Sequence, residues 1–195
     1  DDGDTFHGKR ADGSKIKARL NGYNTLESYG PVHQWGEWTE QELYGFAKES
    51  GVFASGTVWE CTDTQTGGGY GRALVDCPEL RREMLERGFA HPFSIGSAAP
   101  EADLQALRKG IENKAGMWAK GAPSSIITSL HSNDEKPDED AYNRVCSLET
   151  GECTEMNHTD VYTSCQKVCV EELGSCMTYV PYKSRYGDAK ADCLR

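Results

Sequence analysis

The chain has 195 residues, of which 37% are hydrophobic, and it carries a formal net charge of −10. This length and apolar content suffice for one or two domains with a buried core, and no run of about 18 apolar residues occurs, which excludes a membrane-spanning helix. The acidic charge argues against bulk electrostatic binding to nucleic acid, but it is compatible with a small local phosphate site.

Apolar spacing and turn residues predict the elements of the first part of the chain. The predicted strands, in chain order, are 5–10, 14–21, 56–62 and 70–76. The predicted helices, which carry apolar residues at helical spacing, are 39–50, 78–87 and 101–115. This order predicts an α+β fold in which helices cover a small curved sheet or barrel.

Two cysteines flank the glycine run of the third and fourth strands. Cys61 and Cys77 are each eight residues from Gly69. In a hairpin centred there they would face one another, with their Cα atoms about 4.5 Å apart. This separation is near the lower end of the Cα–Cα range that a disulfide accepts. We predict a disulfide between them; two buried free thiols are the alternative.

The other cysteines divide the chain. Six of the eight lie between Cys146 and Cys193, after a segment rich in proline and acidic residues. We therefore predict a globular domain over 1–120, a linker over 121–140 and a cysteine-rich C-terminal extension over 141–195. An even number of cysteines predicts four disulfides and an oxidising compartment. The protein is thus expected to be secreted or periplasmic, with its signal peptide removed.

Four short motifs in the first domain carry candidate chemistry. They are Asp2-Gly3-Asp4-Thr5, Arg19-Leu20, Thr25-Leu26-Glu27 and Tyr70-Gly71-Arg72. In this order, and followed by Arg87-Gly88-Phe89-Ala90 and Trp118, they resemble the staphylococcal nuclease (thermonuclease) family. The resemblance covers about residues 2–120, and the C-terminal extension lies outside it.

The resemblance implies both a fold and an activity. The family's fold is a small OB-type, five-stranded β-barrel with three helices, here followed by a small disulfide-rich C-terminal region. Its activity is calcium-dependent endonucleolytic hydrolysis of phosphodiester bonds. The implied substrates are DNA and RNA with little sequence preference, because contacts to the nucleic-acid backbone carry no base code.

The resemblance also implies a cation site. Asp4, Asn24 and the carbonyl of Thr25 would bind one Ca²⁺ ion or another divalent cation in its place, and Asp2 would lie close by. Hard divalent cations prefer such oxygen ligands. Asn24 stands where the family usually has aspartate, so we expect weaker cation affinity. Leu26 replaces a proline, so we expect the loop that holds Glu27 to be less constrained. The family's first strand precedes the Asp-Gly-Asp motif, and a barrel that lacks half of this strand would have an open edge. Either the chain is truncated or processed, or another segment fills the gap.

Three charged residues and one tyrosine would act on the substrate. By resemblance, Arg19 and Arg72 hold the scissile phosphate, Glu27 is the general base or orients the attacking water, and Tyr70 packs against the nucleotide. Two guanidinium groups can share the charge of a phosphodiester through directional hydrogen bonds. A carboxylate can then deprotonate a water molecule.

Two other classes of function fit the same residues. The first is a catalytically impaired OB-fold module that binds nucleic acid or another anionic ligand through the same groove. The second is a disulfide-rich interaction protein in which the nuclease-like half is a scaffold. Cleavage in calcium separates the enzyme from the first class, and a partner retained by residues 121–195 alone would support the second.

The pairing of the extension's cysteines is left open by the sequence. They are Cys146, Cys153, Cys165, Cys169, Cys176 and Cys193, and six cysteines allow 15 pairings. Cys165 and Cys169 are four apart on an amphipathic stretch, which predicts that they share a helix face. The alternative to structural disulfides is a zinc site formed by Cys153, His158, Cys165 and Cys169.

The end of the extension interleaves aromatic and basic residues. The stretch contains Tyr179, Tyr182, Lys183, Arg185 and Tyr186. Such a stretch can guide a nucleic-acid strand, although most such stretches are simply solvent-exposed surface. The sequence identifies no protein partner for the extension.

Overall fold

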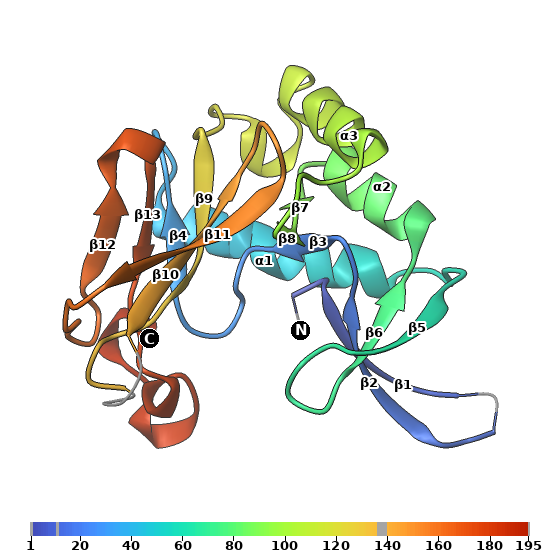
Figure 1. Ribbon diagram of the computed structural model, residues 1–195, viewed down its shortest axis with the longest axis horizontal. Helices are drawn as coiled ribbons and strands as arrows, with labels where there is room; N and C mark the ends of the chain where they lie inside the picture. The colour runs from blue at the N-terminus through green and yellow to red at the C-terminus, as the bar shows by residue number, and fades with distance from the viewer. Residues whose placement is uncertain (1, 11, 136–139, 195) are drawn as a thin grey trace.

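Figure 1 shows the computed structural model of the chain, which describes residues 2–10, 12–135 and 140–194. Its α-helices are α1 (Glu40–Ser55), α2 (Pro78–Glu86) and α3 (Glu101–Glu112). Its strands are β1 (Thr5–Lys9), β2 (Lys15–Leu20), β3 (Tyr23–Thr25), β4 (Val32–Gln34), β5 (Thr62–Gly67), β6 (Ala73–Asp76), β7 (Ala90–Pro92), β8 (Ser94–Ile95), β9 (Ser125–Leu130), β10 (Ala141–Ser147), β11 (Glu152–His158), β12 (Lys167–Val170) and β13 (Ser175–Thr178). This mixture of helices and sheets confirms the predicted α+β class.

The first sheet has the strand order β1-β2-β6-β5. Alternation along β2 places Ala18 and Leu20 on the face that packs against Met84 of α2, while Arg19 points to the other side. β2 pairs antiparallel with β1 and parallel with β6. Among the described residues no pairing joins β1 to β5. The sheet is therefore open, and the closed five-stranded barrel implied by the resemblance is not seen.

Helix α1 begins where its capping residues predict. The Thr39 hydroxyl accepts from the Glu42 amide, and the Glu42 carboxylate accepts from the Thr39 amide, so both ends of a capping box are present. The helix runs to Ser55, beyond the predicted end at Ser50, because Phe53 still packs against the core formed by the first sheet and α2. Within the described ranges, no helix is long and apolar enough to cross a membrane.

The prediction of a strand over 56–62 was wrong, since β5 is shifted to Thr62–Gly67. Val58 is 93% exposed, and the Trp59 indole instead donates to the carbonyl of Ala54 at 2.8 Å. This segment is therefore a connection in which Trp59 packs back on α1 and Val58 faces solvent, rather than an alternating strand.

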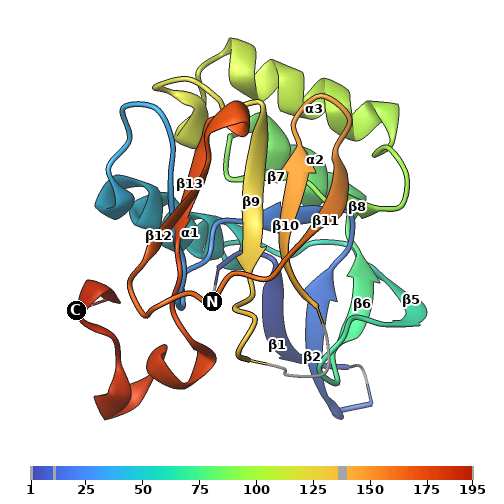
Figure 2. The same ribbon diagram turned by 60° about the vertical axis from the view of Figure 1, so that its left-hand side comes forward.

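The C-terminal region shares its sheets with the first domain. Figure 2 shows β9, β10 and β11 side by side, and the sheet continues into β8. A second sheet joins β12 and β13 to β4. The segment predicted as a linker contains β9, whose Ile126 is fully buried in one core with residues of α1 and α3. Proline and serine around β9 obscured this short apolar strand in the sequence.

The eight cysteines form four disulfides: Cys61–Cys77, Cys146–Cys153, Cys165–Cys193 and Cys169–Cys176. The predicted Cys61–Cys77 bond is confirmed, and four disulfides fit an oxidising compartment. The prediction that Cys165 and Cys169 share a helix face was wrong. Cys169 lies on β12 directly opposite Cys176, while Cys165 lies outside that strand in a left-handed backbone conformation. Of the four residues of the alternative zinc site, the three cysteines are disulfide-bonded, so their sulfur atoms are not available as zinc ligands.

Candidate functional site

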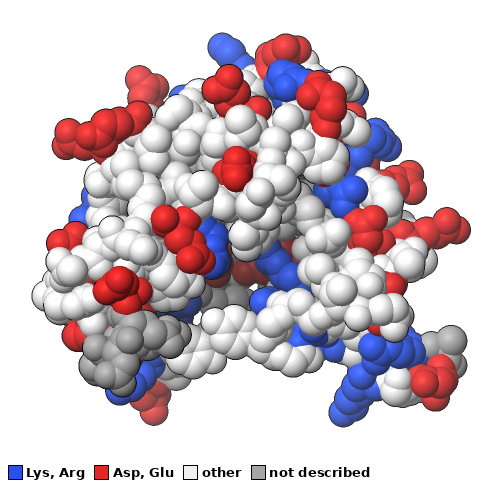
Figure 3. All heavy atoms as spheres, in the orientation of Figure 1, with Lys and Arg blue, Asp and Glu red and all other residues white. Residues whose placement is uncertain are grey.

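A cleft of about 910 Å³ lies between the β1-β2-β6-β5 sheet and the β8-β11-β10-β9 sheet. Figure 3 shows it as a hollow near the middle of one face, with acidic and basic atoms on its walls. Seven predicted site residues line it: Asp2, Asp4, Arg19, Asn24, Glu27, Tyr70 and Arg72. The eighth, Thr25, is hydrogen-bonded to Asp4. The structure thus brings together all eight residues that were predicted to bind the cation or act on the substrate.

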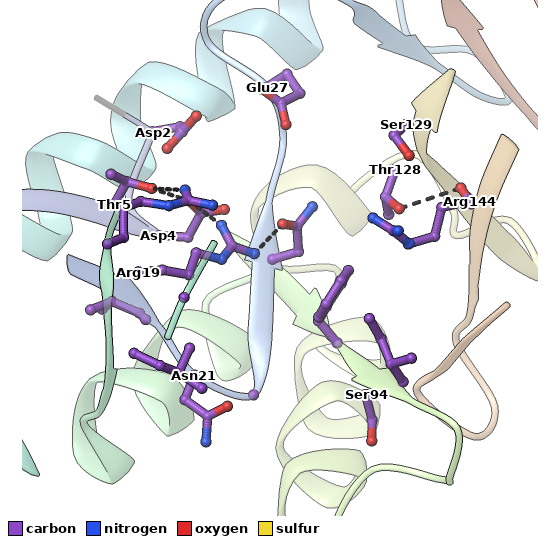
Figure 4. A pocket seen from close by; sticks show the side chains of 18 of the residues that line it. Asp2, Asp4, Thr5, Arg19, Asn21, Glu27, Ser94, Thr128, Ser129 and Arg144 are labelled. Atoms are coloured by element: carbon purple, nitrogen blue, oxygen red, sulfur yellow. Dashed lines mark hydrogen bonds and ion pairs between the residues drawn. The ribbon is translucent and has the colours of Figure 1, made fainter. Parts of the chain in front are cut away.

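Asp4 and Arg19 form an ion pair at the floor of the cleft (Figure 4). Antiparallel pairing of β1 with β2 sets Arg19 opposite Thr5, next to Asp4. Asp4 is 4% exposed, and burial by itself raises a carboxyl pKa. The charge of Arg19 and its hydrogen bond outweigh burial, so that the pKa of Asp4 lies below its usual value. Asp4 is therefore ionised at neutral pH.

Strand β3 supplies further oxygen atoms beside this ion pair. The Thr25 amide and hydroxyl each donate to Asp4 Oδ2 at 3.1 Å. Asn24 Oδ1 accepts from Arg19 Nη2, and Asn24 Nδ2 donates to the carbonyl of Thr25 at 3.1 Å. The three predicted cation ligands therefore form one continuous hydrogen-bonded group.

Two further carboxylates face this group with raised pKa values. Burial, followed by the charges of Asp4 and Glu27, raises the pKa of Asp2 to about 8. Burial and the charge of Asp4 raise the pKa of Glu27 to about 7, although Arg185, Arg19 and Arg72 act in the opposite direction. A general base works best when its pKa lies near the working pH, and the pKa of Glu27 lies near neutral pH.

Arg72 reaches the cleft from the hairpin between β5 and β6. Its Nη1 donates to the Thr5 hydroxyl at 3.1 Å, and that hydroxyl in turn donates to Asp4. A Cβ atom on Gly68 would lie 3.0 Å from the Arg19 Cβ and 3.1 Å from a backbone oxygen, so glycine lets the hairpin approach Arg19 closely. Tyr70 stands at the hairpin tip, 94% exposed, where a nucleotide base can stack on it.

The chemistry of these donors fits a hard divalent cation. Asp2, Asp4, the Asn24 amide and the Thr25 carbonyl offer only oxygen ligands, as Ca²⁺ requires. Burial and, after it, repulsion from Asp4 and Glu27 raise the pKa of Asp2, and a dication would relieve the repulsion. Both Asp4 oxygens already accept two donors each, from Arg19, Thr5 and Thr25. Cation binding at Asp4 would therefore displace one of these donors.

Two buried histidines lie behind the Glu27 loop. His33 Nε2 accepts from the Glu27 amide at 3.3 Å, so its proton is on Nδ1. His91 Nδ1 lies 2.8 Å from the carbonyl of Pro92, which can only accept, so its Nε2 carries a lone pair. Among the described residues, neither His33 Nδ1 nor His91 Nε2 has a hydrogen-bond partner. Burial lowers the pKa of His33 to about 3 and that of His91 to about 4.

Because these buried histidines are neutral, we expect the folded state to lose stability in acid. The unfolded imidazole takes up a proton below about pH 6.5, whereas the folded one does so only near pH 3 to 4, so stability falls as the pH drops below 6.5. Between pH 7 and pH 5 each histidine is expected to remove about 2 kcal/mol of unfolding free energy. The raised pKa values of Asp2 and Glu27 act in the opposite direction, so variants must be compared with the unmodified protein.

Urea unfolding at both pH values, in chelator, measures this difference. His33→Gln keeps an acceptor for the Glu27 amide and should reduce the loss between pH 7 and pH 5 by about 2 kcal/mol. The unmodified protein, measured at both pH values, provides the reference. An equal loss in His33→Gln and the unmodified protein would contradict this account.

Several residues of the cleft were not predicted from the motifs. They belong to the C-terminal region and include Thr128, Ser129, Tyr142, Arg144 and Arg185. Tyr142 and Arg144 are two apart on β10, where they alternate with the buried residues Ala141, Asn143 and Val145. That alternation was the available signal. Arg185 belongs to the stretch of aromatic and basic residues near the C-terminus of the chain. Its Nε donates to the carbonyl of Val180 at 3.0 Å.

A scan against protein-family models and a search of curated proteins find no match to this chain.

Proposed function

We propose that the protein is a calcium-dependent endonuclease that hydrolyses phosphodiester bonds of DNA and RNA with little sequence preference. The observation that carries this proposal is the convergence of Asp4, Arg19, Glu27 and Arg72 on one cleft. Carboxylates, guanidinium groups and amide oxygens at one place suit an anionic substrate together with a cation. The first domain is proposed to be an OB-type domain of the thermonuclease kind, secreted or exported to the periplasm.

The chain's own residues have separable parts in the reaction. Arg19 and Arg72 bind the non-bridging oxygens of the phosphodiester and stabilise the charge that grows on them. Glu27 takes a proton from a water molecule as the water oxygen bonds to phosphorus. One phosphorus–oxygen ester bond breaks, and the departing oxygen is protonated by solvent. Asp4, Asn24 and the Thr25 carbonyl would hold the cation, which would supply positive charge to the site.

The alternative is a module that binds nucleic acid or another anion without cleaving it. It is favoured by one feature, the neutral amide of Asn24 in place of a carboxylate. Digestion of plasmid DNA and of RNA by the non-reduced protein, with calcium, with magnesium and with chelator, separates the two functions. Cleavage in calcium that stops in chelator supports the enzyme. Retention of the nucleic acid without cleavage, by a folded protein, would support the binding module.

Restoring a carboxylate at position 24 is expected to tighten calcium binding. Asn24→Asp adds one negative charge to the oxygen ligands, and the calcium affinity of protein sites rises with the number of charged ligands. We expect the calcium dissociation constant, measured by calorimetry, to fall roughly tenfold. The exposed Asn113, which caps α3, gives the matched control Asn113→Asp. Equal calcium affinity in both variants and the unmodified protein would place the cation elsewhere.

A further inference from the structure

The wall of the cleft opposite the predicted catalytic residues is built by the C-terminal region. Figure 4 shows Arg144 and Thr128 facing Arg19 and Asp4 across the cleft. We propose that Arg144 is a second phosphate-binding position, which holds the substrate strand at a phosphate other than the one being cleaved. This inference rests on the proposed function, because it concerns the same cleft and the same class of polynucleotide.

Strand pairing directs Arg144 into the cleft. β10 is the inner strand between β9 and β11, and its buried residues Asn143 and Val145 point to the opposite face. Tyr142 and Arg144 consequently share the cleft face. The backbone carbonyl of Arg144 accepts from the Thr128 hydroxyl on β9 at 3.3 Å. The base of the side chain is therefore fixed by the sheet.

The guanidinium group of Arg144 is hydrogen-bonded through one of its terminal nitrogen atoms. Nη2 donates to Glu155 Oε1 at 2.7 Å and to the Tyr142 hydroxyl at 3.3 Å, and Cζ lies 5.3 Å from the centre of the Tyr142 ring. Among the described residues, Nε and Nη1 of Arg144 have no hydrogen-bond partner. A guanidinium group held in this way offers two directional donors to an anion with little loss of side-chain entropy.

A structural role for Arg144 is a weaker explanation of this arrangement. Its partner Glu155 is 50% exposed, and exposed ion pairs contribute about 0–1 kcal/mol. The cleft-facing donors take no part in that pair. A polynucleotide presents a phosphate at every nucleotide, so a strand bound at Arg19 and Arg72 has further phosphates for the opposite wall. A small phosphodiester with a single phosphate cannot occupy both positions.

Substitutions of Arg144 and of its ion-pair partner Glu155 are expected to change DNA binding in opposite directions. Arg144→Ala removes a phosphate contact and should weaken binding of a fluorescein-labelled 12-nucleotide DNA strand about tenfold, as measured by anisotropy in chelator. The slope of log affinity against log salt should fall by about 0.7, as expected for one contact to a single strand. Glu155→Gln removes a competing negative charge and should strengthen binding. A purely structural ion pair would make both variants change binding in the same direction.

Control measurements separate this inference from the proposed function. Arg108→Ala removes an arginine from a comparable surface ion pair with Glu101 on α3, outside the cleft, and should leave binding unchanged. In calcium, Arg144→Ala should lower the rate at sub-saturating oligonucleotide more than the rate on bis(p-nitrophenyl) phosphate, a diester with one phosphate. Equal DNA affinity and salt slope in Arg144→Ala and Arg108→Ala, or no binding by the unmodified protein, would overturn the inference. Binding that responds to Arg144→Ala without cleavage in calcium would overturn the proposed function alone.

Discussion

Replacing Glu27 by glutamine is expected to lower the cleavage rate by two to four orders of magnitude. The glutamine amide has nearly the same size but cannot accept the proton of the attacking water, and general-base catalysis typically contributes about 10²–10⁴ in rate. Glu27 has a pKa of about 7, raised by burial and by Asp4, so its loss removes a base suited to neutral pH. The measurement is the initial rate of cleavage of a labelled oligonucleotide at saturating substrate and calcium.

The control for this variant is another glutamate of the same fold. Glu112 is exposed at the end of α3, and Glu112→Gln should leave the rate within a factor of two of the unmodified protein. Glu27→Gln should also retain its thermal transition, because it removes a charge from a crowded carboxylate group rather than a stabilising ion pair. A rate close to that of the unmodified protein would show that another group activates the water.

Replacing Arg19 by alanine is expected to reduce both activity and stability. Arg19 Nη1 pairs with Asp4, and Nη2 bonds to Asn24 and to the carbonyl of Tyr23 at 3.3 Å. Losing a preorganised phosphate contact costs about 10²–10³ in rate. Leaving Asp4 buried without its partner costs about 3–5 kcal/mol of unfolding free energy. Steady-state kinetics and urea unfolding measure the two effects on the same preparation.

Arg19→Lys separates the two effects. Lysine keeps a positive charge beside Asp4, so most of the stability should return. Lysine lacks the planar arrangement of donors that binds two phosphate oxygens, so most of the loss in rate should remain. If the rate recovered together with the stability, Arg19 would act by maintaining the fold rather than by binding phosphate.

Local features of the sequence predicted much of the first domain. Alternation in β2 placed Arg19 on the side away from the apolar core, and symmetric spacing about Gly69 predicted the Cys61–Cys77 bond. These features depend on neighbours in the chain, on strand alternation and on hairpin geometry. The resemblance to thermonucleases selected the remaining site residues, which the fold gathers in one cleft.

The C-terminal region was less predictable because its structure depends on distant pairings. A four-residue spacing of Cys165 and Cys169 fits a helix, yet Cys169 belongs to a hairpin whose partner is Cys176. Cys146 and Cys153 are likewise directly opposite in the β10–β11 hairpin. The hairpin argument used for Cys61 applied to both pairs and would have found them.

The second wall of the cleft follows from contacts between segments far apart in the chain. Arg144 faces the predicted catalytic residues because β10 pairs with β9, and Ile126 of β9 is buried in the core that contains α1 and α3. β8 and β4, which lie in the first domain, complete the two C-terminal sheets. Neither short strand has a periodicity long enough to identify its partner from sequence.

We propose that one cation site serves one phosphodiesterase centre. Calcium binding, followed by calorimetry, and oligonucleotide cleavage, followed by initial rate, are measured over the same calcium titration. Both are expected to half-saturate at the same calcium concentration, cleavage should stop in chelator, and Asn24→Asp should move both midpoints together to lower concentration. Cleavage that continues in chelator, or that saturates independently of calcium binding, would show that the proposed cation site does not serve the reaction.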